Sequence, residues 1–433
     1  MNEEVKGKMK DCHTDSELLT QFHKNTPQLR FSGFEENWKE TKLGEIGETK
    51  SGIGFPDKEQ GGKEGIPFFK VSDMNSDGNE YELTVANNYV TEEQINRNNW
   101  NIVKNVPAVF FAKVGAAVIL NRKRLIRTPF LLDNNTMAYI FDKTIWNCDF
   151  GKHLFETIDL TKLTQVGALP SYNGSDVENL QIYLPPTFAE QQKIGTFLSH
   201  VDSLIQAKTK KLESLKAVKK SLLQKCFPKA GEKVPGMRFA GFSGDWEEKK
   251  LGEVAEISSG TTPSRMNSEN FSGDVCWLTS GELKSHYIYD TSEKINESIA
   301  ETMRTYKKGT VVIAIYGLEA AGIRGTCSIL KRECTISQAC MAFSNLKSVH
   351  NEFLYCWYIA NGNEIGTKYA QGTKQQNLSS DIVSDMAICF PTLAEQQKIG
   401  HFFSKYDSLI STQQKEIDKL KDIKKSLLQK MFC

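Results

Sequence analysis

The chain has 433 residues, 39% of them hydrophobic and 10% aromatic, which argues against wholesale disorder and leaves room for about three domains or two large lobes. Its formal net charge of +1 argues against a protein that coats nucleic acid by bulk electrostatic attraction. Any DNA contact must therefore come from local patches, or be shared with a more basic partner. The 10 cysteines form no Cys-x-x-Cys pair, which favours reduced cysteines packed as small apolar side chains over disulfides or a metal site.

The first segment, residues 1–26, is polar and lacks the apolar stretch of a signal peptide. No apolar run elsewhere approaches the ~18 residues that a membrane-spanning helix needs. We therefore expect a flexible leader at 1–26, in a cytoplasmic protein that contacts no membrane.

Two blocks of sequence occur twice, which indicates an internal duplication. The block at 30–45, with Arg-Phe-x-Gly-Phe followed by Trp and Leu-Gly-Glu, returns at 238–253. The block at 189–225 opens with Ala-Glu-Gln-Gln-Lys-Ile-Gly, ends with Lys-Lys-Ser-Leu-Leu-Gln-Lys, and returns at 394–430. The offsets are 238 − 30 = 208 and 394 − 189 = 205 residues. The order of lobe, repeated helix, lobe and repeated helix predicts two copies of one unit with pseudo-two-fold symmetry.

Both lobes contain short runs typical of β-strands, broken by Gly, Asn and Pro. This pattern predicts an α+β fold with many loops, and loops on a β-scaffold are suitable places for varied recognition. The predicted strands are 109–112, 117–120 and 137–141 in the first half, and 311–316 and 339–343 in the second.

Polar and basic loop residues are candidates for reading DNA, because Arg and Lys suit guanine, Asn and Gln suit adenine, and carboxylates accept from cytosine. The basic run at 121–127 is the densest in the chain and the first choice, although plain surface is the simpler interpretation of any single residue. The first-lobe candidates are Lys70, Ser72, Asp73, Arg122, Lys123, Arg124, Arg127, Asn134, Asn135, Tyr172 and Asn173. The second-lobe candidates are Thr279, Ser280, Glu282, Tyr316, Arg324, Lys331, Arg332, Gln338, Lys374, Gln375, Gln376 and Asn377.

Each repeated helix begins after proline at a threonine, Thr187 or Thr392, which can cap the helix N-terminus. Glu190 and Glu395 lie three residues further on, which predicts a capping box in each copy. Apolar residues then recur at intervals of three and four, as in coiled coils. The helix 187–227 has 227 − 187 + 1 = 41 residues, so it is roughly 60 Å long at 1.5 Å per residue.

Such a helix is too long for one small lobe to bury, and the other copy is its simplest partner. We predict that the two helices pair antiparallel within the chain. The alternatives are packing of each helix on its own lobe alone, or a coiled coil that forms homodimers. We interpret the helix lysines as a solvated face or a protein-contact surface, because acidic residues are interspersed among them.

The sequence contains none of the catalytic signatures that would mark an enzyme of a familiar class. There is no GxxxxGK[ST] phosphate loop, no HExxH zinc motif and no GxSxG nucleophile elbow. The Asn/Asp-Pro-Pro-Tyr tetrad of amino-methyltransferases is also missing, since Pro185-Pro186 only opens a helix. These absences favour a binding subunit.

Residues 27–433 resemble the specificity subunit of Type I restriction–modification enzymes. The resemblance is carried by the Pro-x-x-Arg-Phe-x-Gly-Phe motifs at Pro27 and Pro235, and by the repeated Ala-Glu-Gln-Gln-Lys-Ile and Lys-Lys-Ser-Leu-Leu-Gln-Lys motifs. It implies two mixed α/β target-recognition domains separated by two long antiparallel coiled-coil helices. The implied boundaries are 27–184 and 229–390 for the domains, and 185–228 and 391–433 for the helices.

The resemblance also implies partners. Each domain would read one half of a split double-stranded DNA target. Two methyltransferase subunits would methylate adenines with S-adenosylmethionine, and restriction subunits would use ATP and Mg²⁺. The chain itself would bind no cofactor or metal and supply no catalytic residue. The residues expected in the coiled coil or in methyltransferase docking are Glu190, Gln191, Gln192, Ile194, Leu204, Leu215, Leu222, Glu395, Gln396, Gln397, Ile399, Leu409, Leu420 and Leu427.

Two other classes of function stay open at this point. The first is a stand-alone DNA methyltransferase or nuclease with duplicated recognition domains, which binding of S-adenosylmethionine by the isolated chain would reveal. The second is a coiled-coil scaffold that binds only protein. In that case, replacing the basic residues of 121–127 with alanine would leave function intact.

Overall fold

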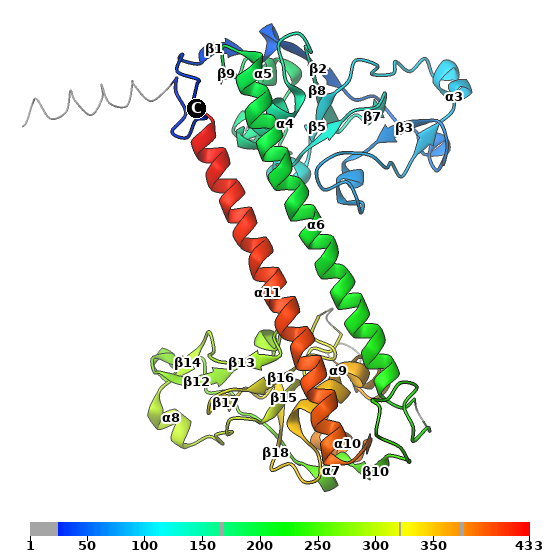
Figure 1. Ribbon diagram of the computed structural model, residues 1–433, viewed down its shortest axis with the longest axis vertical. Coiled ribbons are helices and arrows are strands. Elements are labelled where there is room, and N and C mark those ends of the chain that lie inside the picture. Colours follow the sequence, from blue (N-terminus) through cyan, green and yellow to red (C-terminus); the bar gives the residue numbers. More distant parts are fainter. Residues whose placement is uncertain (1–24, 165–168, 230, 320–321, 373–375) are drawn as a thin grey trace, which may run out of the picture. The chain divides into compact units, whose positions relative to one another are not determined.

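The computed structural model describes residues 25–164, 169–229, 231–319, 322–372 and 376–433 (Figure 1). The chain divides into two compact units. Unit 1 contains Met1–Ala207 and Ile417–Cys433, and unit 2 contains Lys208–Glu416. Within the described ranges, no helix combines the length and apolar character needed to cross a bilayer. Most of the predicted leader, residues 1–24, lies outside the described residues.

Unit 1 holds the first lobe, built on a four-stranded antiparallel sheet in the order β2-β8-β5-β6. A three-stranded sheet in the order β4-β3-β7 packs on one of its faces, and β1 pairs with β9. The strands are β1 Lys39–Lys42, β2 Gly47–Ser51, β3 Ile66–Phe69, β4 Tyr89–Val90, β5 Ala108–Ala112, β6 Lys123–Ile126, β7 Leu131–Leu132, β8 Thr136–Phe141 and β9 Gln181–Leu184. The helices are α3 Glu92–Arg97, α4 Cys148–Thr157 and α5 Gly174–Glu178, with 3₁₀ turns η1 Leu43–Glu45, η2 Asp57–Glu59, η3 Val71–Asn75, η4 Ala116–Leu120 and η5 Leu160–Leu163.

The inner strands β5 and β8 of the first lobe are buried on both faces, which explains their uninterrupted apolar runs. Successive side chains of a strand point to opposite faces. In β5, Val109 and Phe111 join the core that contains Phe155 of α4. Phe110, between them, joins the core that contains Phe69 of β3. Apolar residues are therefore needed at every position of this strand.

Unit 2 holds the second lobe, whose sheets have the orders β11-β18-β15-β16-β13 and β14-β12-β17, with a separate β10-β19 pair. Its strands are β10 Glu247–Lys250, β11 Glu256–Ser259, β12 Val275–Leu278, β13 Tyr287–Ile288, β14 Lys294–Ile295, β15 Val311–Ala314, β16 Cys327–Leu330, β17 Thr335–Ile336, β18 Cys340–Ser344 and β19 Ala387–Phe390. Its helices are α7 Leu251–Val254, α8 Glu297–Glu301, α9 Asn351–Lys368 and α10 Ser380–Ser384, with 3₁₀ turns η6 Ser268–Phe271 and η7 Ser280–Glu282.

The two lobes repeat one strand order with one addition. The order β2-β8-β5-β6 of the first lobe corresponds to β11-β18-β15-β16 of the second. In the second lobe β13 joins β16 as a fifth, parallel strand. In the first lobe a single parallel bridge between Glu82 and Leu125 takes that place. The predicted internal duplication is therefore present in the fold as well as in the sequence.

The structure bears out most of the predicted strands and contradicts one. The predictions at 109–112, 137–141, 311–316 and 339–343 correspond to β5, β8, β15 and β18. The predicted strand 117–120 was wrong, because this segment forms the 3₁₀ turn η4. Gly115 before it has a φ of 89° and Asn121 after it has a φ of 49°, so the chain turns at both ends and leaves no extended stretch between them.

The two long helices are α6, Phe188–Cys226, and α11, Leu393–Met431, of 39 residues each (Figure 1). The predicted cap of α6 is present, since the Glu190 backbone N–H donates to Thr187 Oγ1 at 3.3 Å. The second half of the predicted capping box is replaced, because the carboxylate of Glu190 accepts from Arg30 and Trp38. The carboxylate of Glu395 likewise accepts from Arg238.

Contacts within each unit show that α6 and α11 run antiparallel. In unit 2, Lys208 Nζ of α6 lies 2.7 Å from Glu416 Oε2 of α11, and Lys219 pairs with Asp407. The residue numbers on α11 thus decrease as those on α6 increase, as they do in an antiparallel pair of helices. In unit 1, Lys424 Nζ lies 2.7 Å from Asp202 Oδ1, and Phe432 shares a core with Ile194. The antiparallel pairing predicted from the helical stripes is confirmed.

Candidate nucleic-acid interface

In the first lobe, loops that are far apart in the sequence meet at the end of the sheet where β5 finishes. The Asp133 N–H donates to Phe69 O at 3.0 Å, which brings the turn before β8 to the end of β3. The Lys113 N–H donates to Asn135 O at 2.9 Å, and the Gly115 N–H to Pro170 O at 2.9 Å. We call this region the polar end of the first lobe. It includes Lys70, Ser72, Lys113, Arg122, Asn134 and Asn135.

The predicted residues at this polar end differ in availability. Ser72, Asn134 and Asn135 are exposed, whereas Lys70 is half-buried and its Nζ lies 3.0 Å from Gln60 Oε1. Asp73 is fully buried, and its carboxylate accepts from the backbone N–H groups of Lys70 and Asn87. Asp73 therefore shapes the η3 turn instead of presenting a carboxylate to a ligand.

The basic run at 121–127 is dense in sequence but is dispersed in space, because most of it is strand β6. The Lys123 side chain is buried, and burial lowers its pKa to about 8. The Arg124 guanidinium donates to the backbone oxygens of Asn79 and Lys123. Arg127 lies past the opposite end of β6, where it forms ion pairs with Glu82 and Asp149. Of this run, only Arg122 stands at the polar end, where it donates to Asn75 Oδ1.

Two other predicted residues near the polar end have structural partners. The Tyr172 hydroxyl donates to Ala112 O at 2.5 Å, and the residue is 5% exposed. The Asn173 side chain caps α5 by accepting from the Asp176 N–H. Lys113 belongs to the polar end although it is not among the predicted residues, and Gln60 contacts Lys70 there. Lys113 follows β5 directly, so its position after a buried strand was the available signal.

In the second lobe, the equivalent loops meet where β15 finishes. The Ser337 N–H donates to Leu278 O at 2.8 Å, the Ile315 N–H to Ala339 O at 3.0 Å, and the Leu318 N–H to Gln376 O at 3.0 Å. Arg324 Nη2 donates to Gln376 Oε1 at 3.0 Å. The polar end of the second lobe thus gathers Thr279, Ser280, Tyr316, Arg324, Gln338, Gln376 and Asn377.

The remaining second-lobe candidates are placed elsewhere or are engaged. Glu282 accepts from Thr279 and from the Ser292 N–H, so its carboxylate holds the η7 turn. Lys331 and Arg332 follow β16 at the opposite end of the sheet, where Lys331 Nζ lies 3.7 Å from the centroid of the Tyr287 ring. Lys374 and Gln375 lie outside the described residues.

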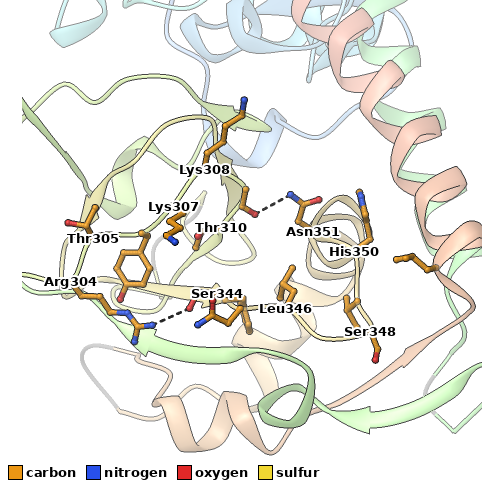
Figure 2. A pocket seen from close by; sticks show the side chains of 16 residues that line it. Arg304, Thr305, Lys307, Lys308, Thr310, Ser344, Leu346, Ser348, His350 and Asn351 are labelled. Carbon is orange, nitrogen blue, oxygen red and sulfur yellow. Dashed lines mark hydrogen bonds between the residues drawn. The ribbon is translucent and has the colours of Figure 1, made fainter.

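The second lobe also has a basic pocket of about 700 Å³ at the end of the sheet where β15 begins (Figure 2). Arg304, Lys307, Lys308 and His350 contribute to its lining. The Asn351 side chain donates to Gly309 O at 3.1 Å, and Arg304 is tied to Glu256 at 2.6 Å. This pocket is therefore a feature separate from the polar end.

The repeated motifs attach each lobe to its helix. Arg30 donates two hydrogen bonds to Glu190, at 2.6 and 2.8 Å, and Arg238 donates two to Glu395, both at 2.7 Å. Gln191 binds the backbone of the segment before α4, as Gln396 does before α9. Glu190, Gln191, Glu395 and Gln396 are at most 3% exposed. These four side chains therefore attach the lobes to the helices, and their assignment to methyltransferase docking stays a prediction.

A second, duplicated contact is a buried ion cluster beneath each lobe. Asp202 of α6 pairs with Lys424 of α11 in unit 1, and Asp407 of α11 pairs with Lys219 of α6 in unit 2. The two aspartates are 205 positions apart and so are the two lysines, since 407 − 202 = 205 and 424 − 219 = 205, and each pair therefore joins one helix copy to the other. The duplication therefore preserves a cross-helix ion pair, which the repeated motifs alone do not reveal.

The two clusters differ in the cation that the lobe adds. In unit 1, Lys152 of α4 pairs with Asp202, and burial lowers the pKa of the neighbouring His153. In unit 2, His286 Nε2 lies 2.8 Å from Glu352 Oε2, and its Nδ1 lies 3.1 Å from Asp407 Oδ2. Burial opposes protonation of His286, but the hydrogen bond to Glu352 and the negative charges of Asp407 and Glu352 outweigh burial and raise its pKa.

Among the residues that the structure describes, one group has the composition of a metal site: His153, Glu156 and Asp202. Lys424 Nζ lies 2.6 Å from Glu156 Oε2 and 2.7 Å from Asp202 Oδ1. Since the ammonium groups of Lys152 and Lys424 already neutralise both carboxylates, we assign this group to ion pairing.

Three pairs of equivalent positions on α6 and α11 carry exposed apolar residues. Phe188 and Leu393 are 47% and 52% exposed, Leu204 and Leu409 are both 46% exposed, and Val218 and Ile423 are 46% and 42% exposed. Gln192 and Gln397 are exposed as well. Of the other predicted docking or coiled-coil residues, Ile194 and Ile399 are buried, and Leu215, Leu222, Leu420 and Leu427 are half-buried. Each unit therefore presents a similar apolar helix surface.

The amino-acid sequence matches the model of a known protein family. The sequence model of the family described as "Type I restriction modification DNA specificity domain" matches residues 35–217 and 243–422. These two segments make up most of the sequence, and each covers one lobe with part of the following helix. The chain belongs to this family.

Two curated relatives are specificity subunits of Methanocaldococcus jannaschii. The MjaIX specificity subunit is 27% identical over 194 residues, which cover 43% of this chain and 44% of that protein. The MjaVIII specificity subunit is 24% identical over 293 residues, which cover 62% of this chain and 65% of that protein. The chain thus spans between about two fifths and two thirds of the length of these relatives.

Solved structures share the fold. The S subunit of a Type I restriction–modification system from M. genitalium has a TM-score of 0.60 at 15% identity, covering 94% of this chain and 99% of that one. A chain from a study of assembly and conformational transition of the type I R-M system has a TM-score of 0.55 at 16% identity, covering 93% and 99%. At these identities the likeness concerns the fold alone.

Proposed function

We propose that this chain is the non-catalytic specificity subunit of a Type I restriction–modification complex, and that each lobe reads one half of a bipartite DNA target with its polar end. The observation that carries the proposal is that two lobes of one fold each gather polar side chains at the same end of the sheet, and that these side chains differ between the lobes. Membership of the DNA specificity domain family supports this role over a stand-alone enzyme or a scaffold.

Each polar end offers side chains that suit adenine and side chains that suit guanine. The first lobe offers Asn134, Asn135 and Arg122, and the second offers Gln338, Gln376 and Arg324. Amides form paired hydrogen bonds with adenine, and guanidinium groups with guanine. Because the net charge of the chain is only +1, we expect partner subunits to make part of the contacts to the DNA phosphates.

The duplicated helix surface supports two copies of one partner. Exposed apolar side chains at equivalent positions, such as Leu204 and Leu409, offer the same contact twice. We assign these surfaces to two methyltransferase subunits, which would bind S-adenosylmethionine. Restriction subunits would bind ATP and Mg²⁺. In this proposal the chain itself binds no cofactor.

The test is a genome-wide map of adenine methylation in cells with and without this gene, with its methyltransferase partner present. The proposal predicts that one split motif, two short defined blocks around a fixed gap, disappears with the gene. If methylation is unchanged while the partner is demonstrably active, the chain does not direct methylation and the proposal fails.

A further inference from the structure

The segment that the sequence predicts as a strand, η4, exposes two adjacent large aliphatic side chains at the polar end of the first lobe. Ile119 is 66% exposed and Leu120 is 57% exposed, whereas Val118 beside them is 2% exposed. A third aliphatic residue, Leu169, is 56% exposed and precedes Pro170, whose carbonyl oxygen accepts from the Gly115 N–H at 2.9 Å. Two neighbouring loops thus each present an apolar side chain to solvent.

This presentation is built into the lobe. The Asn121 N–H donates to Val118 O at 2.9 Å, and Asn121 adopts the left-handed conformation. Its side chain accepts from the Leu160 N–H at 3.1 Å and from Lys123 Nζ at 2.7 Å, and donates to Ile158 O at 3.3 Å. These bonds tie the end of η4 to the segment after α4. This hydrogen-bonded turn therefore keeps Ile119 and Leu120 exposed to solvent.

The charges around the pair indicate what covers it. Arg122 follows two residues later and donates to Asn75 of the η3 turn, so a guanidinium stands beside the pair. Lys162 of η5, a turn that packs against η4, is also exposed. An apolar centre flanked by cations suits a DNA groove, in which the thymine methyl group is the apolar feature of the major-groove edge.

Resting on the proposed function, we propose that Ile119 and Leu120 are specificity-determining residues that contact thymine C5-methyl groups in the half-site read by the first lobe. They add an apolar contact to the hydrogen bonds offered by Asn134 and Asn135. Deoxyuridine, which lacks only that methyl group, is therefore the probe that isolates the contact.

The experiment uses the full chain with its methyltransferase partner, and duplexes that contain the mapped motif with single thymines replaced by deoxyuridine. We expect the wild-type complex to lose about fourfold in affinity at one or more thymines of one half-site, the amount expected for one buried methyl group. The double variant Ile119→Asn/Leu120→Asn binds more weakly and no longer distinguishes thymine from deoxyuridine there. Val85→Asn, at a residue 50% exposed in the same lobe, is the matched control and behaves as wild type.

Three results would overturn the inference. The first is a wild-type complex indifferent to deoxyuridine at every thymine, and the second is a double variant that still discriminates. The third is a double variant that loses its methyltransferase partner while Val85→Asn retains it, because the pair would then be a protein contact. Failure of the proposed function looks different: the wild-type complex would not prefer the motif-containing duplex to a scrambled one.

Discussion

The two lobes share a strand order, but they differ in the side chains of the polar end and in the cation that each adds to the ion cluster at the helices. At the polar end the first lobe presents asparagines and an exposed Ile–Leu pair, whereas the second presents glutamines and Arg324. At the helices, both lobes rest on the same cross-helix Lys–Asp pair, to which one adds Lys152 and the other His286. The comparison shows that the duplication preserves the attachment of lobe to helix and leaves the polar ends free to diverge.

The largest difference between the units is expected when the buried aspartate is removed. Asp202 is 3% exposed and pairs with Lys152 and Lys424, so Asp202→Ala leaves both ammonium groups with Glu156 as their remaining anion and should cost about 3–5 kcal/mol of unfolding free energy. Asp407→Ala should cost less, roughly 1–3 kcal/mol, because His286 can release its proton when its partner is lost. Urea unfolding measures the change, and hydrogen exchange of α4 and α9 assigns it to a unit.

Glu416→Ala is the control for both variants. Glu416 is 48% exposed and pairs with Lys208, so its loss should change stability by no more than about 1 kcal/mol. Equal losses for Asp202→Ala and Asp407→Ala would mean that the two clusters are energetically equivalent, against the comparison drawn here.

A smaller difference should appear in how the stability of each unit against unfolding depends on pH. The pKa of His286 is raised in the folded protein, so protonated His286 stabilises unit 2 fully at a pH below about 6.5, the pKa of an unperturbed histidine. This stabilisation is lost as the pH rises through the pKa of His286 in the folded protein. The pKa of His153 is lowered by burial, so unit 1 gains stability as pH rises toward about 6.5. The groups facing His286 are Glu352, Asp407, Lys219, Tyr287 and Tyr355.

Unfolding of His286→Gln and His153→Gln, followed between pH 5.5 and 8.5, tests these signs. His286→Gln should remove the loss of unit 2 stability at high pH, and His153→Gln should remove the gain of unit 1. A wild-type unit 2 that becomes more stable as pH rises through this window would show that His286 is not held in its protonated form.

The smallest effect on stability, and the most selective effect on DNA, is expected at the polar ends. Asn134 and Gln338 are exposed, so Asn134→Ala and Gln338→Ala should each change the unfolding free energy by less than about 0.5 kcal/mol. Each should relax one position of one half-site, with about 1–3 kcal/mol less discrimination. Methylation mapping with each variant checks this, and a change in both half-sites from either substitution would argue against one lobe per half-site.

The parts of the fold that follow local rules could be predicted from sequence. The long helices follow from the proline–threonine start signals at Thr187 and Thr392 and from the 3-and-4 spacing. Their antiparallel pairing follows from two stripes too long for one lobe to cover. The buried strands follow from short apolar runs. The same rule failed at 117–120, because an apolar run says nothing about the turns that Gly115 and Asn121 impose.

The candidate site was less predictable, because its residues meet only in three dimensions. The run 121–127 is basic in sequence, but strand β6 sends Lys123 inward and engages Arg124 with backbone oxygens. Glu190 and Gln191 look like a polar docking surface in sequence, yet their partners Arg30 and Asn147 lie 160 and 44 residues away. Non-local hydrogen bonds decide which polar residues remain available, and local sequence does not contain them.

The most direct test of the central claim, that each lobe reads its own half-site, is an exchange of one lobe. Residues 30–180 are replaced by the corresponding segment of another family member, and adenine methylation is mapped with the same methyltransferase partner. The account predicts that one half of the split motif changes while the other half keeps its sequence. A change in both halves, or in neither while the complex remains active, would contradict it.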